Sequence, residues 1–169
     1  FVIANDTDHY RKYFRVLSKD LDNAKQSVTD IYNMLISSRR SPIGKAKLSM
    51  RMLYPEIFAK TDTKREETMS SFTTSTGIKV IAKSILPDQR GNVQGDEESS
   101  RPDFDWYDDF ETRATLISAI MTHKIWLNME EAKDGLAKEG SSEYTCNYIS
   151  EQGNVHKLVQ RVENKMVVP

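Results

Sequence analysis

Residues 95–111, GDEESSRPDFDWYDDFE, form the stretch of the sequence with the highest density of groups that could do chemistry. Carboxylate oxygens are the ligands that hard cations such as Mg²⁺ and Ca²⁺ prefer. The alternative interpretation is a solvated helix N-terminus, where acidic side chains interact favourably with the helix dipole. Because the glycine and ligand spacing of a calcium loop are missing, we favour the helix N-terminus and predict no metal site. The acids concerned are Asp103, Asp105, Asp108, Asp109 and Glu111.

Within this stretch, Pro102-Asp103 followed by Glu111-x-Arg113 resembles the PD…(D/E)xK pattern of metal-dependent nucleases. The resemblance implies two carboxylates that hold divalent metal ions and a basic residue that helps to organise the attacking water. Arg113 stands where the pattern has lysine and cannot deprotonate. The set is also similar to that of the cap-cleaving endonuclease domains of segmented RNA viruses when it is extended by His9 and Glu66 or Glu67. A divalent-metal-dependent nuclease is the remotest function considered.

Other catalytic patterns are missing from the sequence. It contains neither GxxxxGK[ST] nor GxGxxG, and its three histidines are far apart with no HExxH spacing. No nucleophile-elbow motif supports a serine triad. We therefore expect a non-enzymatic protein with no catalytic residues, no cofactor and no small-molecule substrate.

Residues 37–51, SSRRSPIGKAKLSMR, carry five cations and no acid. Such a stretch can contact phosphates of RNA or DNA without sequence preference and with a steep dependence on salt. Anionic membrane surfaces are a second possible target, and a solvated surface loop is the alternative without function. The predicted anion-binding residues are Arg39, Arg40, Lys45, Lys47 and Arg51.

Aromatic side chains lie among the acids of residues 95–111, which is typical of a protein-binding segment in which rings anchor and charges steer. The predicted partner-binding residues are Phe104, Asp105, Trp106, Tyr107, Asp108 and Asp109. A basic loop of one copy could dock on the acidic segment of the next, and such head-to-tail contacts build rings or filaments. We therefore predict an assembly or interaction domain of the kind found in viral matrix or nucleocapsid-associated proteins. Its partner would be itself or another protein, and a sequence-independent RNA- or DNA-binding domain is the alternative.

The lone cysteine, Cys146, excludes an internal disulfide and a thiolate-based zinc site. We expect a buried, inert thiol and a reducing intracellular compartment, cytoplasmic or nuclear. No apolar run approaches the roughly 18–20 residues that span a bilayer. No signal peptide is visible. Because the chain begins with Phe1 rather than Met, we expect it to be part of a longer protein.

The clearest predicted element is a long helix over residues 8–37. Apolar residues recur there at alternating steps of four and three, which is the 3.5-residue period of a packed helix seam. The seam favours packing within the same domain over a dimer interface, because its flanking positions lack complementary charge pairs. It consists of Tyr10, Phe14, Leu17, Leu21, Ala24, Val28, Ile31 and Leu35.

Five further elements are predicted downstream. Pro42 at a first helical position indicates a second helix to about Tyr54, and Ser75-Thr76-Gly77 indicates a hairpin of strands 68–74 and 77–86. Residues 87–103 lack apolar periodicity and suggest a mobile loop. A helix over 105–127 is predicted next, with a strand over 114–127 as the alternative. A short helix follows, which Asn128 and Glu131 begin as a capping box and Gly140 ends. The C-terminal part, from Glu143, suggests a second hairpin.

The predicted fold class is therefore α+β: a long N-terminal helix and a second helix, then a small antiparallel sheet of two hairpins with one or two further helices. The chain of 169 residues fits a single domain over 1–169. A helical part over 1–67 and a mixed part over 68–169 is a possible subdivision.

Overall fold

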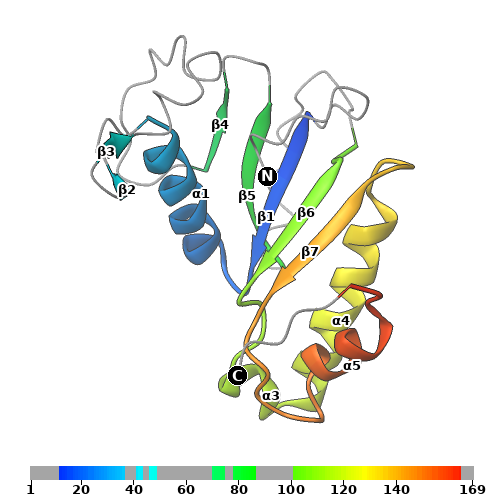
Figure 1. Ribbon diagram of the computed structural model, residues 1–169. Helices are drawn as coiled ribbons and strands as arrows, with labels where there is room; N and C mark the ends of the chain where they lie inside the picture. The colour runs from blue at the N-terminus through cyan, green and yellow to red at the C-terminus, as the bar shows by residue number, and fades with distance from the viewer. Residues whose placement is uncertain are drawn as a thin grey trace.

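The computed structural model describes residues 12–36, 41–43, 46–48, 70–74, 78–86 and 101–164. Its centre is a five-stranded sheet with the strand order β4-β5-β1-β6-β7 (Figure 1). The strands are β1 (Tyr13–Ser18), β4 (Ser71–Thr73), β5 (Lys79–Ser84), β6 (Phe104–Asp108) and β7 (Ser141–Thr145).

Most neighbouring strands in this sheet are parallel. The central strand β1 pairs in parallel with β5 on one side and with β6 on the other, and β7 continues in parallel from β6. Only the edge strand β4 runs antiparallel, against β5. The predicted α+β fold with two antiparallel hairpins is therefore wrong, and the chain has a mixed, mostly parallel α/β sheet. Parallel neighbours require crossover connections, and the helices supply them.

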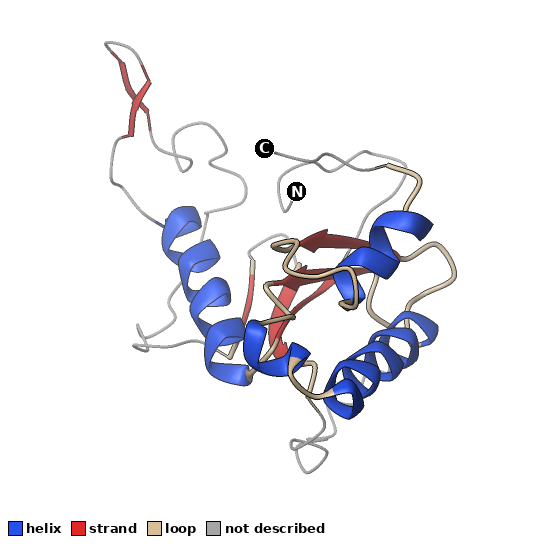
Figure 2. Ribbon diagram, turned by 90° about the horizontal axis from the view of Figure 1, so that it is seen from below, coloured by secondary structure: helices blue, strands red, loops and turns tan. Residues whose placement is uncertain are grey.

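Helices lie on both faces of the sheet, as the view from below shows (Figure 2). Helix α1 (Leu21–Ile36) covers one face, where Ala24, Val28 and Tyr32 pack against strand residues such as Val16 and Val80. Helices α4 (Ala119–Asp134) and α5 (Asn154–Arg161) cover the other face with a second apolar cluster. The alternating side chains of each central strand therefore feed two separate cores.

The long helix predicted over residues 8–37 is wrong in its first half. Residues 13–18 form β1, and the helix begins only at Leu21. The carboxylate of Asp20 accepts a hydrogen bond from the Asn23 amide at 2.8 Å, which is the geometry of a helix N-cap. The apolar steps up to Leu17 matched a helical period by coincidence, because a buried strand also places apolar residues at Phe14, Val16 and Leu17.

The hairpin predicted over residues 68–74 and 77–86 is confirmed as the β4–β5 pair, with Phe72 opposite Val80. The second helix predicted from Pro42 is wrong, since β2 (Ser41–Ile43) and β3 (Ala46–Leu48) form a two-stranded antiparallel ribbon. Residues 87–100 of the predicted loop lie outside the described residues.

The helix predicted over residues 105–127 is wrong in its first part, which β6 occupies, but residues 113–116 and 119–127 are helical. The alternative, a strand over 114–127, is therefore wrong. After β6 come α3 (Arg113–Leu116), which Thr112 caps, and α4, which Ser118 caps. The predicted new helix start at Asn128 is also wrong: α4 continues past it, and the Asn128 amide donates to the Ile85 carbonyl at 2.6 Å. Tertiary pairing here overrides the local helical spacing.

The C-terminal hairpin is wrong as well. Strand β7 pairs with β6 rather than with a following strand, and residues 154–161 form α5. Among the described residues, no helix combines the length and apolar character that crossing a bilayer requires.

Candidate functional site

The connections of the sheet reverse direction between β1 and β6. From β1 the chain passes through α1 to β5 on one side, whereas from β6 it passes through α4 to β7 on the other side. The helices that follow these two strands therefore leave toward opposite faces (Figure 2). In open α/β sheets, ligands bind outside the carboxyl ends of the strands at such a switch point. The candidate site is thus the carboxyl end of β1 and β6.

Two polar residues meet at this end of the sheet. Leu17 of β1 pairs with Tyr107 of β6, so the next residues, Ser18 and Asp108, are neighbours across the two strands. The Asp108 carboxylate accepts a hydrogen bond from the Ser27 hydroxyl of α1 at 2.7 Å. The Ser18 hydroxyl is buried and has no hydrogen-bond partner within the described part of the chain. A buried hydroxyl without a partner is unusual in folded proteins and calls for an explanation.

Asp109 follows β6 in a left-handed backbone conformation with φ of 44°. Non-glycine residues seldom adopt this region, although aspartate is one of those that tolerate it. The Asp109 amide donates to the Thr145 carbonyl at 3.0 Å, which fixes the turn against β7. Asp108 and Asp109 thus place two adjacent, partly exposed carboxylates at the switch point.

Glu111 ties the same turn to α5. Its buried carboxylate accepts hydrogen bonds from the backbone amides of Asn154 at 2.7 Å and Val155 at 3.3 Å. These amides form the first turn of α5, which has no side-chain cap of its own. The Asn154 amide group in turn donates to the Thr122 carbonyl of α4 at 2.8 Å. Glu111 therefore serves as a distant N-cap that joins the β6 turn to both helices of this face.

Cys146, just after β7, lies beside these acids. Burial raises the pKa of its thiol to about 11, and the negative charges of Glu111 and Asp109 add to this rise. A thiol with a raised pKa is mostly protonated near neutral pH and is a poor nucleophile. Cys146 is therefore a reporter of the local negative charge rather than a reactive group.

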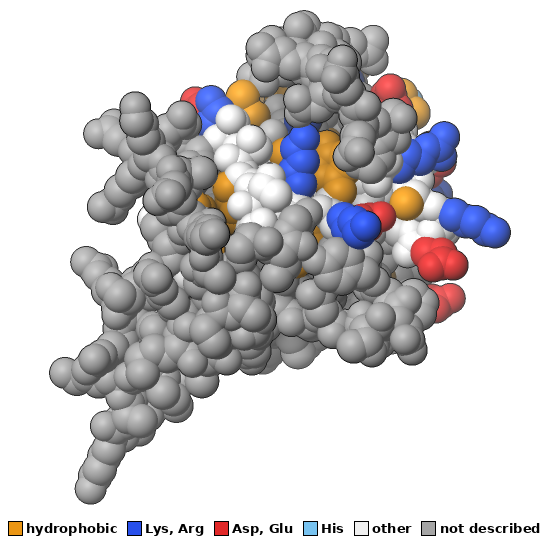
Figure 3. Space-filling view, turned by 90° about the horizontal axis from the view of Figure 1, so that it is seen from above, with side chains coloured by type: hydrophobic (Ala, Val, Ile, Leu, Met, Phe, Trp, Pro, Cys, Tyr) orange, Lys and Arg blue, Asp and Glu red, His pale blue; other side chains and the backbone are white. Residues whose placement is uncertain are grey.

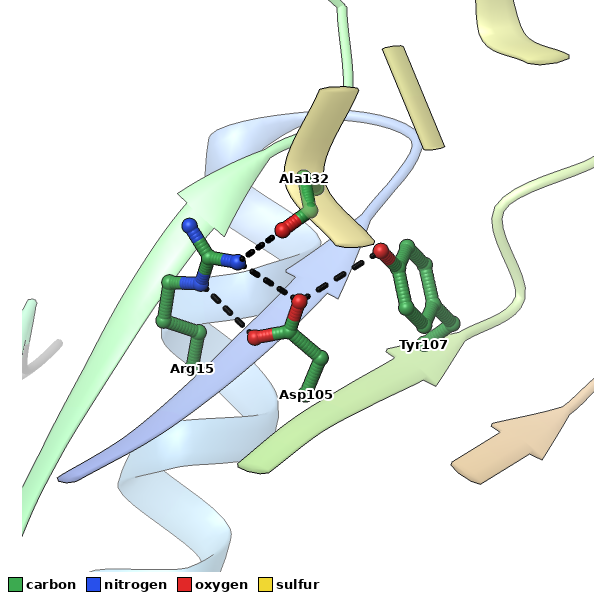
Figure 4. Close-up of polar contacts among 4 residues, drawn as sticks. All are labelled: Arg15, Asp105, Tyr107 and Ala132. Atoms are coloured by element: carbon green, nitrogen blue, oxygen red, sulfur yellow. Dashed lines mark hydrogen bonds and ion pairs between the residues drawn. The ribbon is translucent and has the colours of Figure 1, made fainter. Parts of the chain in front are cut away.

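An ion pair between β1 and β6 holds the two strands of the site together (Figure 4). The Arg15 guanidinium donates to both carboxylate oxygens of Asp105, at 2.7 Å and 2.6 Å, and to the Ala132 carbonyl of α4 at 2.9 Å. The Tyr107 hydroxyl approaches the same carboxylate at 3.4 Å. Burial raises the pKa of Asp105, while the guanidinium opposes that rise. The pair sits in the interior and has a structural role.

The residues at the switch point can act chemically in one clear way. Mg²⁺ is commonly bound by one or two carboxylates that share it with the phosphates of a substrate, rather than by a full cage of protein ligands. Among the residues that the structure describes, no three His, Cys, Asp or Glu side chains come close enough to hold a metal ion alone. Asp108 and Asp109 are two carboxylates that are adjacent in the chain at the end of β6.

The predicted partner-binding segment is mainly interior. Phe104, Asp105 and Tyr107 are buried in the two cores or in the ion pair. Trp106 is partly buried against the α1 core, and its indole donates to the Thr145 hydroxyl at 3.0 Å. Asp108 and Asp109 lie at the carboxyl end of the strand and are partly exposed.

The predicted basic site lies almost wholly outside the described residues, which exclude Arg39, Arg40, Lys45 and Arg51. The backbone of Lys47 pairs with Pro42 in the β2–β3 ribbon.

The view from above, onto the amino ends of the strands, shows Lys and Arg side chains together with Asp and Glu side chains in the described part of the surface (Figure 3). Charge-driven assembly, and the alternative of binding RNA, DNA or an anionic membrane through residues 37–51, remain predictions.

The nuclease pattern is not assembled. The Asp103 carboxylate accepts hydrogen bonds from the Lys12 and Tyr13 amides at the amino end of β6, whereas Glu111 caps α5 beyond its carboxyl end. A five-residue strand separates the two, and at about 3.3 Å per residue this is at least about 16 Å. The two carboxylates therefore cannot share a metal ion. His9, Glu66 and Glu67 lie outside the described residues.

The sequence does not reveal Ser18, Ser27 and Arg15 as neighbours of the site, because the helical period over residues 8–37 predicts one long helix that contains all three. The signal that could have found Ser18 is the change from an apolar run at Phe14–Leu17 to Ser18-Lys19-Asp20, a strand end followed by a helix cap. No family model, no curated protein and no solved structure matches the chain.

Proposed function

We propose that the chain binds a phosphate-bearing ligand together with Mg²⁺ at the carboxyl end of β1 and β6. The observation that carries this proposal is the pair Asp108–Asp109 at the switch point, with Asp108 oriented by the Ser27 hydroxyl at 2.7 Å. A hydrogen bond that fixes a carboxylate prepares it as a metal ligand. The ion would be held by the two carboxylates and would meet the phosphate oxygens of the ligand on its remaining positions.

The surroundings support this assignment. Lys19, directly after β1, is partly exposed and has no ion-pair partner within the described residues, so its ammonium group is available to an anionic phosphate. The Ser18 hydroxyl beside Asp108 is fully buried and unpaired within the described residues. The left-handed backbone conformation of Asp109 is energetically unfavourable. Such conformations occur preferentially at functional sites, where they orient a side chain.

The arrangement also permits a reaction. A bound Mg²⁺ would polarise a phosphate oxygen, and one carboxylate would accept a proton from the water molecule that attacks phosphorus. The P–O bond to the leaving alcohol or phosphate would break as the new P–O bond forms, and that group would leave with the negative charge that Mg²⁺ offsets. Asp108 accepts the Ser27 hydrogen bond. The proton would therefore go to the second oxygen of the Asp109 carboxylate, whose first oxygen would hold the ion. We therefore propose phosphate-ester or phosphoanhydride hydrolysis as the reaction class of this site.

The test is a binding titration with ATP and with inorganic pyrophosphate, each with and without Mg²⁺, followed by calorimetry and by the thermal unfolding midpoint. Mn²⁺ replaces Mg²⁺ for spectroscopic detection of the bound ion. We expect binding that requires both ion and phosphate. Asp108→Asn should abolish it, and Ser27→Ala should weaken it by roughly 10-fold or more, as for other groups that orient metal ligands.

Asp134→Asn is the matched control, because Asp134 is exposed at the end of α4 and lies outside the proposed site. Its titrations should equal those of the unaltered chain. Equal binding by the Asp108→Asn and Asp134→Asn variants would contradict the proposal, as would binding of phosphate ligands that Mg²⁺ does not change.

A further inference from the structure

A second candidate site lies on α3 and the segment that follows β7. These two stretches bound a hollow of about 580 Å³, lined by Arg113, Leu116, Ile117, Asn147, Tyr148 and Ile149. The segment after β7 runs past α3 on its way to α5 (Figure 1). The hollow involves neither Asp108 nor Asp109, so binding in it is independent of the proposed phosphate site.

An exposed apolar lip extends the hollow. The side chains of Ile117 and Ile120 are 88% and 83% exposed, at the corner where α3 ends and α4 begins. Single apolar residues are common on protein surfaces, but here Ile117 also lines the hollow, and Ile120 is a second exposed isoleucine three residues further along. Apolar surfaces of this kind, rimmed by polar groups, mark interaction sites.

The charge of the residues that line the hollow favours a negatively charged ligand. Arg113 is exposed and has no ion-pair partner within the described part of the chain. Its guanidinium is the sole cation among the six lining residues, and none of them is acidic. A guanidinium next to aliphatic walls matches a carboxylate that is attached to an apolar group. Nucleic acid is a poorer match, because its affinity depends on several cations that neutralise successive phosphates.

One wall of the hollow is already fixed in position. The Tyr148 hydroxyl bonds to Nδ1 of His156 at 2.7 Å, and the two rings meet edge to face with centroids 5.9 Å apart. Nε2 of His156 in turn lies 2.9 Å from the Gln160 amide nitrogen. Tyr148 is nevertheless 54% exposed. An exposed aromatic side chain that is held by its own neighbours binds a partner at a small entropic cost.

We propose that the surface formed by Arg113, Ile117, Ile120 and Tyr148 docks a segment of another protein in which a large aliphatic side chain stands next to a carboxylate. The aliphatic side chain fills the hollow between Leu116 and Ile149, and the carboxylate pairs with Arg113. A protein segment fits better than a small molecule, because a molecule confined to the hollow would leave the lip at Ile120 uncovered.

The test uses three acetylated ten-residue peptides in which a central leucine is flanked by aspartates, by asparagines or by lysines. Binding is followed through the backbone amide resonances of Arg113, Ile117 and Tyr148 in the isotopically labelled full chain. We expect the aspartate peptide to shift these resonances and the lysine peptide to leave them unchanged. Arg113→Glu should reverse this preference, and the aspartate peptide should lose affinity by about tenfold, as expected for one charge-assisted contact.

Two variants separate the apolar part of the surface from general effects. Ile117→Ser combined with Ile120→Ser should abolish binding of all three peptides, whereas Leu127→Ser, at another exposed position of α4, should not. Arg101→Glu is the charge control, since Arg101 is exposed at the amino end of β6. Equal shifts by the aspartate and asparagine peptides, or an unchanged preference in Arg113→Glu, would overturn the proposal. Self-association in sedimentation that the isoleucine variant removes would overturn it in favour of a second copy of this chain.

Discussion

The Arg15 guanidinium of β1 donates two hydrogen bonds, of 2.7 Å and 2.6 Å, to the Asp105 carboxylate of the neighbouring parallel strand β6. The Asp105 side chain is fully buried, so the pair is almost withdrawn from water. Removing two charges from water has a large desolvation cost, which the attraction between them offsets only in part. The pair specifies how β1 and β6 align, and the free energy of unfolding depends on both partners together.

Loss of one partner should therefore be far more damaging than loss of both. Arg15→Met leaves a buried, unpaired carboxylate and should lower the free energy of unfolding by about 3–5 kcal/mol. The combined variant Arg15→Met with Asp105→Leu should regain most of that loss. Urea unfolding of the two variants is the measurement. If the double variant has the same free energy of unfolding as Arg15→Met, the loss does not come from the unpaired charge, and this explanation is wrong.

The same pair gives a prediction for pH. Burial raises the folded-state pKa of Asp105 above its unfolded value, so the folded chain retains a proton that the unfolded chain releases. The contribution of Asp105 to stability is therefore fully present below the unfolded pKa, about 3.9, and is lost as pH rises through the folded pKa. The measurement is the free energy of unfolding in urea from about pH 3.5 upward, just below that unfolded value. We expect it to fall with rising pH in the unaltered chain by an amount that is missing in the double variant. Parallel pH profiles of the two proteins would refute the assignment.

Cys146 provides a readout of the charge at the switch point. With its pKa at about 11, alkylation of the thiol by iodoacetamide should be slow at pH 8 and should accelerate as pH approaches 11. Asp109→Asn removes one of the negative charges that raise this pKa and should speed the reaction at pH 8. Asp134→Asn should leave the rate unchanged.

A bound cation should act on Cys146 in the same direction. Mg²⁺ with pyrophosphate at Asp108 and Asp109 would screen the Asp109 charge, lower the thiol pKa and raise the alkylation rate. Pyrophosphate alone should not do so. A rate that is insensitive to saturating Mg²⁺ and pyrophosphate would count against the proposed ligand site, independently of any activity assay.

Gly153 is required by the cap that Glu111 makes on α5. A Cβ atom at this position would overlap the Glu111 carboxylate, so Gly153→Ala must displace it from the Asn154 and Val155 amides. We expect a loss of about 1–3 kcal/mol in the free energy of unfolding, the usual cost of overpacking an interior. Gly135→Ala, where the nearest atom to the added Cβ is 3.2 Å away, is the matched control and should cost less. Equal unfolding midpoints for the two variants would show that the Glu111 cap is dispensable.

Replacement of Ser18 should affect stability and ligand affinity in opposite directions. Replacing its buried, unpaired hydroxyl by hydrogen in Ser18→Ala removes an uncompensated polar group and should leave stability unchanged or raise it by up to about 1 kcal/mol. If the hydroxyl is retained for the ligand, affinity for Mg²⁺ with pyrophosphate should fall in the same variant. Thermal unfolding and calorimetry on one preparation give both values. Greater stability with unchanged affinity would remove Ser18 from the site.

The sequence predicted local pairing better than long-range pairing. The β4–β5 hairpin is recognisable because the sequence Ser75-Thr76-Gly77, which is typical of turns, stands between two runs rich in Thr, Val and Ile. Strand β1 could not be recognised in this way, because it pairs with β5 and β6, which lie more than 60 and 85 residues further along. Its apolar residues also fit a helical period, and nothing local distinguishes the two.

The candidate site was predicted only in part, for the same reason. Asp108 and Asp109 were singled out as acidic, but their role depends on which strand ends beside β6. Asp105 has the same chemistry in the sequence and lies inside the protein, because its partner Arg15 comes from a strand 90 residues away. Composition identifies the acids, whereas the topology of the sheet decides which of them meet a ligand.

Strand β6 explains why acids and aromatic rings alternate in FDWYD. Phe104, Trp106 and Asp108 face α1, while Asp105 and Tyr107 face α4, so neighbouring letters belong to different halves of the interior. Inserting a single residue into β6 would exchange the two sets. Both apolar cores, the Arg15 pair and the Ser27 contact would then fail together. Strand β6 thus contributes to both cores at once. Only an insertion or deletion of an even number of residues in β6 would keep each side chain on its own face of the sheet.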